Sequence, residues 1–96
     1  MSTITERVER GAALLDEKRP GWWRLIDLGR LDIDSDRNCV IRQLGSYVGT
    51  VRGLGLYYSA ADVAHGFQGD DDDETAALTV AWRDLIGQRL AQAVPA

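Results

Sequence analysis

The sequence predicts an all-α fold, a small single-domain bundle of four to five helices formed by residues 1–96. Three observations predict it. Apolar residues recur at helical spacing in several segments, helix-capping residue types stand before these segments, and no segment alternates convincingly like a half-buried strand. With 96 residues, of which 45% are hydrophobic, the chain is long enough for one modest core. Only the end, about 93–96, is expected to fray.

The first predicted helix begins after Thr3. Thr3 and Glu6 have the spacing of a capping box, in which side chain and backbone satisfy each other's hydrogen bonds. One face of this helix is apolar and consists of Ile4, Val8, Gly11, Ala12 and Leu15. Because glycine inside a helix costs about 1 kcal/mol relative to alanine, we interpret Gly11 as the site of a close helix contact. Pro20 and Gly21 end the helix.

A short helix is expected at the two neighbouring tryptophans, with Trp22, Leu25 and Ile26 turned inward. Successive residues of a helix point about 100° apart. Trp22 and Trp23 therefore cannot both face the core, and one of them is expected at its edge. A partly exposed tryptophan often anchors a protein partner, so Trp23 is a predicted partner-binding residue.

A middle helix is predicted to begin near Asp36, with one apolar face formed by Val40, Leu44, Tyr47, Val48 and Val51. On its other side, Gly45, Gly49 and Gly53 recur at every fourth position. Two interpretations stay open. The glycines let two helices approach closely, within the fold or across a homodimer interface, or the helix kinks or breaks around Gly45.

The start of this segment resembles a calcium-binding loop, because Asp32, Asp34 and Asp36 form a D-x-D-x-D pattern. Such a loop needs glycine at its sixth position and a bidentate glutamate at its twelfth. Counted from Asp32, these positions hold Arg37 and Gln43. We therefore expect no metal and interpret the aspartates as helix-capping residues.

The last two predicted helices follow. Ser59 is the expected cap of a short helix, Ala60 to His65, which Gly66 ends. A long helix then runs from about Asp72 to Ala91, with a buried stripe of Leu78, Ala81, Trp82, Leu85 and Ile86.

Five consecutive carboxylates precede and open the last helix: Asp70, Asp71, Asp72, Asp73 and Glu74. Acidic residues are favoured in the first turn of a helix, where they interact with the positive end of its dipole. A solvated helix start is the simpler interpretation of the run. Since one or two carboxylates are enough for that, the surplus predicts a surface that binds a basic patch of a partner.

Several other functions are disfavoured by the sequence. The net charge is −4 and no basic patch is visible, which argues against direct nucleic-acid binding. Arg42 and Arg52 interrupt the most apolar window, so no membrane span is expected. Cys39 and His65 are the sole thiol and imidazole, and no signature pairs them as a nucleophile and base. We expect a non-enzymatic protein without cofactor. One cysteine and the absence of a signal-peptide pattern predict a reduced cytoplasm, that of the bacterial host if the resemblance given below holds and the chain is phage-encoded.

The alternative function is a nucleic-acid-associated regulator. A helix-turn-helix-like segment can be drawn from Val40 to Phe67, with Ala60 to Phe67 as its recognition helix. That helix has no arginine or lysine and contains Asp62, whereas contacts in a DNA groove need donors aimed at bases and phosphates.

Short motifs distributed from Val8 to Ile86 are Pro20-Gly21-Trp22, Ile26-Asp27, Arg30-Leu31-Asp32, Cys39-Val40, Gln43, Gly66-Phe67 and Trp82. In their spacing and residue types they resemble a family of small uncharacterised proteins of actinobacteria and their phages. Trp23 and the long acidic run depart from that pattern. The resemblance implies a small helical domain and a source, but no activity. The function that we expect is protein–protein binding, on host machinery if the chain is phage-encoded.

Overall fold

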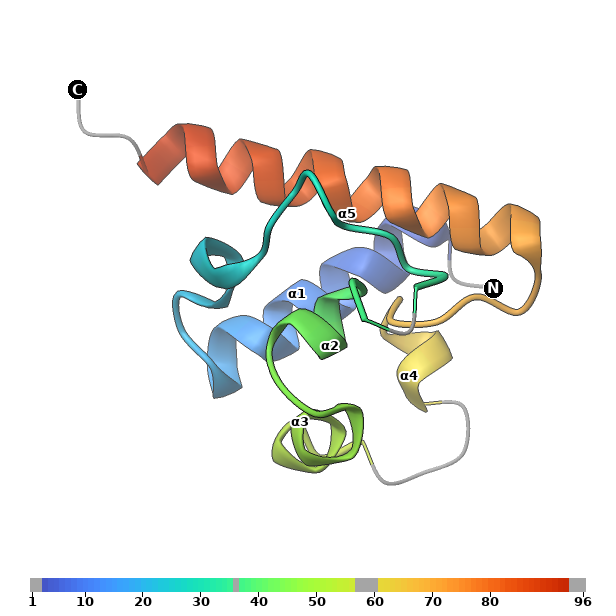
Figure 1. Cartoon of the computed structure of the whole chain (residues 1–96), viewed down its shortest axis with the longest axis horizontal. Coiled ribbons are helices and arrows are strands. Elements are labelled where there is room, and N and C mark those ends of the chain that lie inside the picture. The colour runs from blue at the N-terminus through green and yellow to red at the C-terminus, as the bar shows by residue number, and fades with distance from the viewer. Residues whose placement is uncertain (1–2, 36, 57–60, 94–96) are drawn as a thin grey trace.

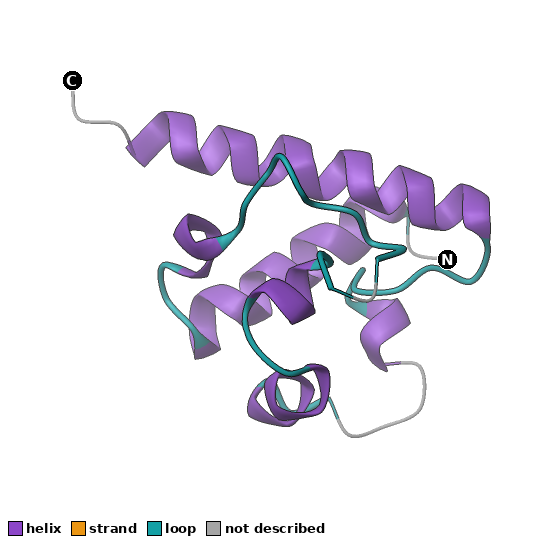
Figure 2. Ribbon diagram, viewed as in Figure 1, coloured by secondary structure: helices purple, strands orange, loops and turns teal. Residues whose placement is uncertain are grey.

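The predicted all-α fold is confirmed by a computed structural model, which describes residues 3–35, 37–56 and 61–93. The described residues form no strand (Figures 1 and 2). In chain order, the elements are α1 (Ile4–Lys18), the 3-10 helix η1 (Trp22–Leu25), α2 (Val40–Gln43), α3 (Tyr47–Gly53), α4 (Ala61–Ala64) and α5 (Asp72–Ala93).

The two long helices, α1 and α5, are the frame of the molecule. They run in the same direction and are joined by an ion pair near each end, Arg7–Glu74 at 2.9 Å and Asp16–Arg89 at 2.6 Å. In Figure 1, α5 extends along one side of the molecule, and α2, α3 and α4 lie on the opposite side of α1. None of the helices in the described ranges is both long and apolar enough to cross a bilayer.

The core is centred on Trp82 of α5, which is fully buried. Its ring stacks on Phe67, with centroids 5.4 Å apart, and forms a T-shaped pair with Trp22, with centroids 5.7 Å apart. Its indole Nε1 donates a hydrogen bond to the carbonyl oxygen of Gly66 at 2.6 Å. Aromatic pairs in these geometries are worth about 0.5–1.5 kcal/mol beyond their burial. The predicted inward positions of Trp22 and Trp82 are therefore confirmed.

Helix α1 has the predicted start and the predicted close contact. Thr3 and Glu6 form both hydrogen bonds of the capping box. Gly11 is buried, and a Cβ atom there would collide with the carbonyl oxygen of His65 and lie 3.0 Å from the Trp82 ring. Gly66 has a φ of 75° and ends the short helix, as predicted, and it also lies against the backbone of α1.

The predicted start of the middle helix near Asp36 is wrong, whereas the break around Gly45, one of the two interpretations that the sequence left open, is confirmed. Helix α2 begins only at Val40, and α3 follows after a break at Gly45, whose φ of 145° is incompatible with a helix. Cys39 precedes α2 and makes no side-chain capping bond. Asp36 lies outside the described residues, and Asp32 and Ser35 cap turns of the preceding loop instead of a helix.

At the short helices, the prediction for Leu25 is wrong, and the predicted cap Ser59 is not among the described residues. Leu25 was expected in the core, but its position on the outer side of η1 leaves it 63% exposed, whereas Ile26 is buried as predicted. The predicted cap Ser59 lies outside the described residues, and α4 is formed by Ala61–Ala64. Helix α5 begins at the predicted residue and continues to Ala93, so most of the predicted frayed end, 94–96, is also not described.

Candidate protein-binding surface

The fold brings together two acidic clusters that are far apart in the sequence. Asp32 and Asp34, from the loop before α2, lie beside Asp70, Asp71 and Asp72, from the start of α5. We call these five residues the acidic face. They surround two adjoining clefts of about 630 Å³ and about 300 Å³, and both clefts are lined by Asp34 and Asp72.

Two side chains of α5 fix the loop that carries Asp32 and Asp34. The hydroxyl of Thr79 accepts a hydrogen bond from the Ile33 amide at 3.0 Å. One turn further along the helix, Arg83 donates to the carbonyl oxygen of Leu31 at 2.9 Å. Leu31 and Ile33 are themselves buried, so the exposed aspartates between and after them are presented toward solvent. These contacts hold the loop, and with it Asp32 and Asp34, in one position on the surface.

Gln43 of α2 holds the same loop from the other side. Its amide oxygen accepts from the Asp27 amide at 2.6 Å, and its amide nitrogen donates to the carbonyl oxygens of Asp27 and Asn38 at 3.3 and 2.9 Å. Gln43 occupies the position where a calcium loop would need its glutamate, and here it joins the two ends of the loop.

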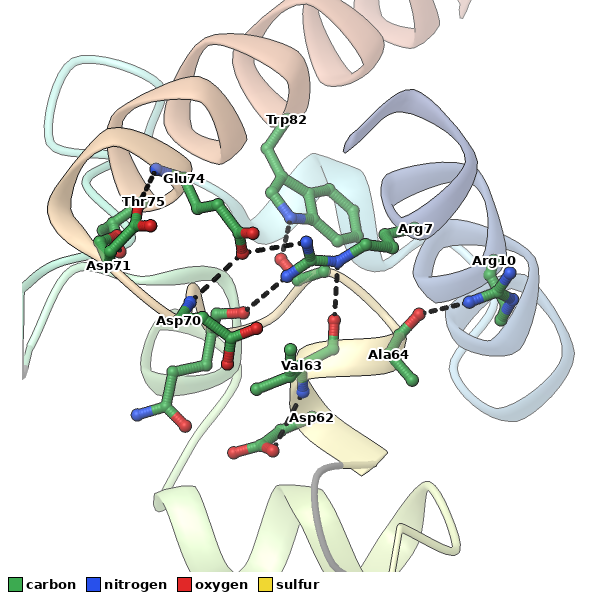
Figure 3. A network of polar contacts seen from close by, with 12 residues as sticks. Arg7, Arg10, Asp62, Val63, Ala64, Asp70, Asp71, Glu74, Thr75 and Trp82 are labelled. Carbon is green, nitrogen blue, oxygen red and sulfur yellow. Dashed lines mark hydrogen bonds and ion pairs between the residues drawn. The ribbon is translucent and has the colours of Figure 1, made fainter. Parts of the chain in front are cut away.

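Two carboxylates of the acidic run, those of Asp71 and Glu74, form hydrogen bonds that stabilise the start of α5. The Asp71 carboxylate accepts from the Glu74 amide at 2.8 Å, which is a helix-capping bond. The Glu74 carboxylate accepts from the Asp70 amide at 3.1 Å and from Arg7 at 2.9 Å (Figure 3). These contacts, with the Asp70 amide the stronger, lower the pKa of Glu74 below its ordinary value.

Arg7 is the centre of the polar network in Figure 3. Its side chain is only 9% exposed, and besides Glu74 it donates to the carbonyl oxygens of Val63 and Gln68, at 2.9 and 3.2 Å. Arg7 thus ties α1 to the end of α4, to the connection before α5 and to α5 itself. Glu74, which was predicted to bind a partner, is engaged inside the molecule.

The remaining carboxylates of the acidic run point into solvent. Asp70 and Asp72 line the larger cleft, and their carboxylates have no hydrogen-bonding or ion-pairing partner in the described ranges. The carboxylate of Asp34 has none either. Asp73 is exposed on the same turn as Asp72 but lines neither cleft. The five carboxylates of the acidic run therefore separate into cleft-lining, outward-facing and internally paired members.

The larger cleft has an apolar floor and one basic residue at its rim. Ile33, Cys39 and Phe67 line it and are buried, and the exposed Arg42 is its one basic residue. Burial raises the pKa of the Cys39 thiol above its ordinary value. A protonated thiol at the base of the cleft is a poor nucleophile.

The other predicted contact residues lie apart from the acidic face. Trp23 is half-buried against the core, and the guanidinium of Arg24 lies 4.8 Å from its ring centroid. Gly49 and Gly53 are exposed on α3, while Gly45 lies between α2 and α3, so the three glycines do not follow one helix. A Cβ atom at Gly53 would have no neighbour within 4 Å. Close helix packing inside the described fold occurs at Gly11 and not at these glycines.

The acidic face does not have the geometry of a metal centre. Across the described ranges, no three side chains of His, Cys, Asp or Glu are grouped to hold a metal ion. The Nδ1 atom of His65 lies 2.8 Å from the carbonyl oxygen of Ala61. Because a carbonyl oxygen can only accept a hydrogen bond, His65 Nδ1 is the donor of this bond.

Sequence reasoning missed Arg7, Gln43, Thr79 and Arg83, which organise this surface. One of them had a visible signal. Arg7 stands between Ile4 and Gly11 at helical spacing, so it interrupts the apolar face of α1, and an arginine there needs acceptors. Gln43, Thr79 and Arg83 bond to backbone atoms of a distant loop, and no spacing in the sequence indicates such contacts.

Comparisons with known protein families, with curated proteins and with solved structures find no match to this chain.

Proposed function

We propose that the protein acts by binding a basic surface of another protein through its acidic face. The observation that carries the proposal is the gathering of Asp32 and Asp34 with Asp70, Asp71 and Asp72 around two shared clefts. Neighbouring like charges destabilise a fold through repulsion, and a partner with the opposite charge relieves that repulsion on binding.

The larger cleft suits lysine and arginine side chains. These side chains pack their aliphatic stems on apolar surface while the charged end stays at the rim. Ile33 and Phe67 line the cleft, and the carboxylates of Asp34, Asp70 and Asp72 line it as well. A basic side chain of the partner would then interact with several carboxylates at once, which favours a specific orientation and a fast encounter.

If the chain is phage-encoded, as the resemblance to small phage and actinobacterial proteins would imply, the partner is a protein of the bacterial host. A nucleic-acid-associated regulator is the alternative function, and the structure offers it less support. The described part of its recognition helix, α4, is Ala61–Ala64, and its end is turned toward α1, where Arg7 binds the Val63 carbonyl. The acidic face would also repel a phosphate backbone.

Two adjacent residues provide a matched test. Asp72→Lys and Asp73→Lys change the net charge equally on the same first turn of α5, but only Asp72 lines the clefts. The tagged wild type and both variants are compared in quantitative pull-downs from host lysate, at low and at raised salt. The amount of partner captured by Asp72→Lys and by Asp34→Lys should fall at least about tenfold, while Asp73→Lys should capture as much as the wild type. Raised salt should weaken the wild-type capture.

Equal capture by Asp72→Lys and Asp73→Lys would show that the clefts are not the binding surface. No specific capture by the wild type, with and without crosslinking, would contradict the proposed function itself. A gel shift at low salt tests the nucleic-acid alternative, because phosphate contacts appear there and fade as salt rises.

A further inference from the structure

A second surface lies on a different flank of α5 from the acidic face, in a groove between α1 and α5. The groove has a volume of about 450 Å³. Its apolar lining consists of Ile4 and Val8 from α1 and of Ala77, Val80, Ala81 and Leu85 from α5. Val80 is 59% exposed and is one of two large hydrophobic residues that stand out on the described surface.

The charged residues along this groove are both acidic. Glu9 of α1 and Asp84 of α5 line it, together with the neutral Thr5 and Gln88, and none of the described lysines or arginines does. Both carboxylates are exposed, and neither has a hydrogen-bonding or ion-pairing partner in the described part of the chain. One carboxylate from each helix therefore lines the groove beside its apolar residues.

We propose that this groove binds an amphipathic helix of another protein, with an apolar stripe facing the groove and lysine or arginine residues on both sides of that stripe. The groove lies between two helices that run in the same direction and are held by ion pairs near both ends. A third helix fills such a space by packing its ridges between theirs. The small residues Ala77 and Ala81 permit its close approach.

The extent of the groove sets the size of the bound segment. Its lining on α5 extends from Ala77 to Gln88, which corresponds to about three turns of helix. Basic residues on both sides of the stripe would meet Glu9 on one wall and Asp84 on the other. A second copy of this chain fits less well, because a symmetric pairing through the groove would bring these unpaired carboxylates toward one another.

This surface is separate from the acidic face, so its test is independent of the proposed function. The probe is a display library of helical peptides of about three turns, with a fixed leucine stripe and with the flanking positions randomised among Lys, Arg, Gln and Glu. Selection on the wild-type protein should enrich Lys and Arg at the flanks. The enriched peptides should lose at least about tenfold in affinity for Val80→Asp and for the double variant Glu9→Lys/Asp84→Lys.

The matched control for Val80→Asp is Leu25→Asp, because Leu25 is the other large exposed hydrophobic residue, at 63%, and lies on η1. This control should bind the peptides like the wild type, as should Asp72→Lys on the acidic face. All these positions are exposed, so the variants should keep their helical circular dichroism spectra. No enrichment, enrichment of acidic or neutral flanks, or equal binding to Val80→Asp would overturn the proposal. So would a wild-type dimer in solution that Val80→Asp converts to monomer.

Discussion

Arg7 of α1 and Glu74 of α5 form an ion pair with 2.9 Å between Nη1 and Oε1, although they are 67 positions apart in the sequence. The same Glu74 oxygen accepts the Asp70 amide, so one carboxylate both orders the start of α5 and holds it to α1. Neighbouring Asp70 and Asp72 face the clefts instead. The acidic run therefore combines a folding role with the surface that we propose for binding.

Replacing Arg7 by glutamine should lower the free energy of unfolding by about 3 kcal/mol, the range for breaking a buried charged contact. Arg7 satisfies two backbone carbonyls as well as Glu74, and glutamine cannot reach all three acceptors. Urea unfolding followed by circular dichroism measures the change. Arg37→Gln, at an exposed arginine, should stay within about 0.5 kcal/mol of the wild type. A similarly small change at Arg7 would show that its network contributes little.

Gly11→Ala should destabilise the protein by about 1–3 kcal/mol, the usual cost of overpacking, even though alanine is the better helix former. The new methyl group would meet the carbonyl oxygen of His65 and the Trp82 ring. Gly87→Ala in α5 is the matched control, because a Cβ atom there has no neighbour within 4 Å. It should raise the free energy of unfolding by about 0.5–1 kcal/mol and so raise the melting temperature. If both variants were stabilised, the close approach at Gly11 would be refuted.

The helices that the sequence predicted correctly are those with local start and stop signals and one continuous apolar face. For α1, the capping box at Thr3 and the apolar spacing were sufficient. For α5, the carboxylates before Asp72 and the stripe around Trp82 were sufficient. In both cases the information lies within the helix itself or in the few residues before it.

The segment from Asp32 to Gly45 could not be predicted in this way. Its capping residue types stand before an apolar run, which favours a helix from about Asp36, but α2 begins only at Val40. The separation of α2 from α3 at Gly45, whose φ is 145°, was one of the two interpretations of the glycine spacing. The position of the loop depends instead on hydrogen bonds that its Ile33 and Asp27 amides donate to Thr79 and Gln43, and these form only once the chain has folded. For the same reason, the sequence indicated two acidic clusters but not that they would meet.

Gln43→Leu should loosen the loop that carries Asp32 and Asp34. The variant loses three hydrogen bonds, two of them to Asp27, and should be less stable by about 1–3 kcal/mol. Hydrogen exchange should be faster at the Asp27 amide than in the wild type, while amides in the middle of α5 should change only as far as global stability does. An unchanged Asp27 amide would show that Gln43 does not hold the loop.

Cys39 should react slowly with thiol reagents in the folded protein. The residue is 5% exposed, and burial raises the pKa of its thiol, so little reactive thiolate is present near pH 7. Labelling with iodoacetamide, followed by mass spectrometry, should become at least about tenfold faster in denaturing urea. Fast labelling of the native protein, at the rate of a free cysteine, would contradict this and would reopen the question of a reactive thiol in the larger cleft.

Asp16 should make the free energy of unfolding depend on pH in the acid range. Hydrogen bonds from Arg89 and then from Trp22 lower the pKa of the Asp16 carboxyl. A carboxyl whose pKa is lower in the folded state stabilises that state above its unfolded pKa, which is about 3.9, and the contribution disappears as the pH falls through the folded value. Asp16→Asn should therefore be less stable than the wild type at pH 7. The difference should be modest, under about 1 kcal/mol, because the pair is partly solvated.

Urea unfolding of both proteins between about pH 2 and pH 7 measures this difference. The two stability curves should approach one another as the pH falls below about 4, the ordinary carboxyl pKa. They should meet only below the lowered pKa of the folded state, where the wild-type carboxyl is protonated and resembles the neutral amide. The control is Asp84→Asn, since Asp84 has no ion-pairing partner in the described part of the chain. That substitution should leave the shape of the curve unchanged. A difference between Asp16→Asn and the wild type that stays constant down to pH 2 would mean that the Asp16 contacts act through shape and not through charge.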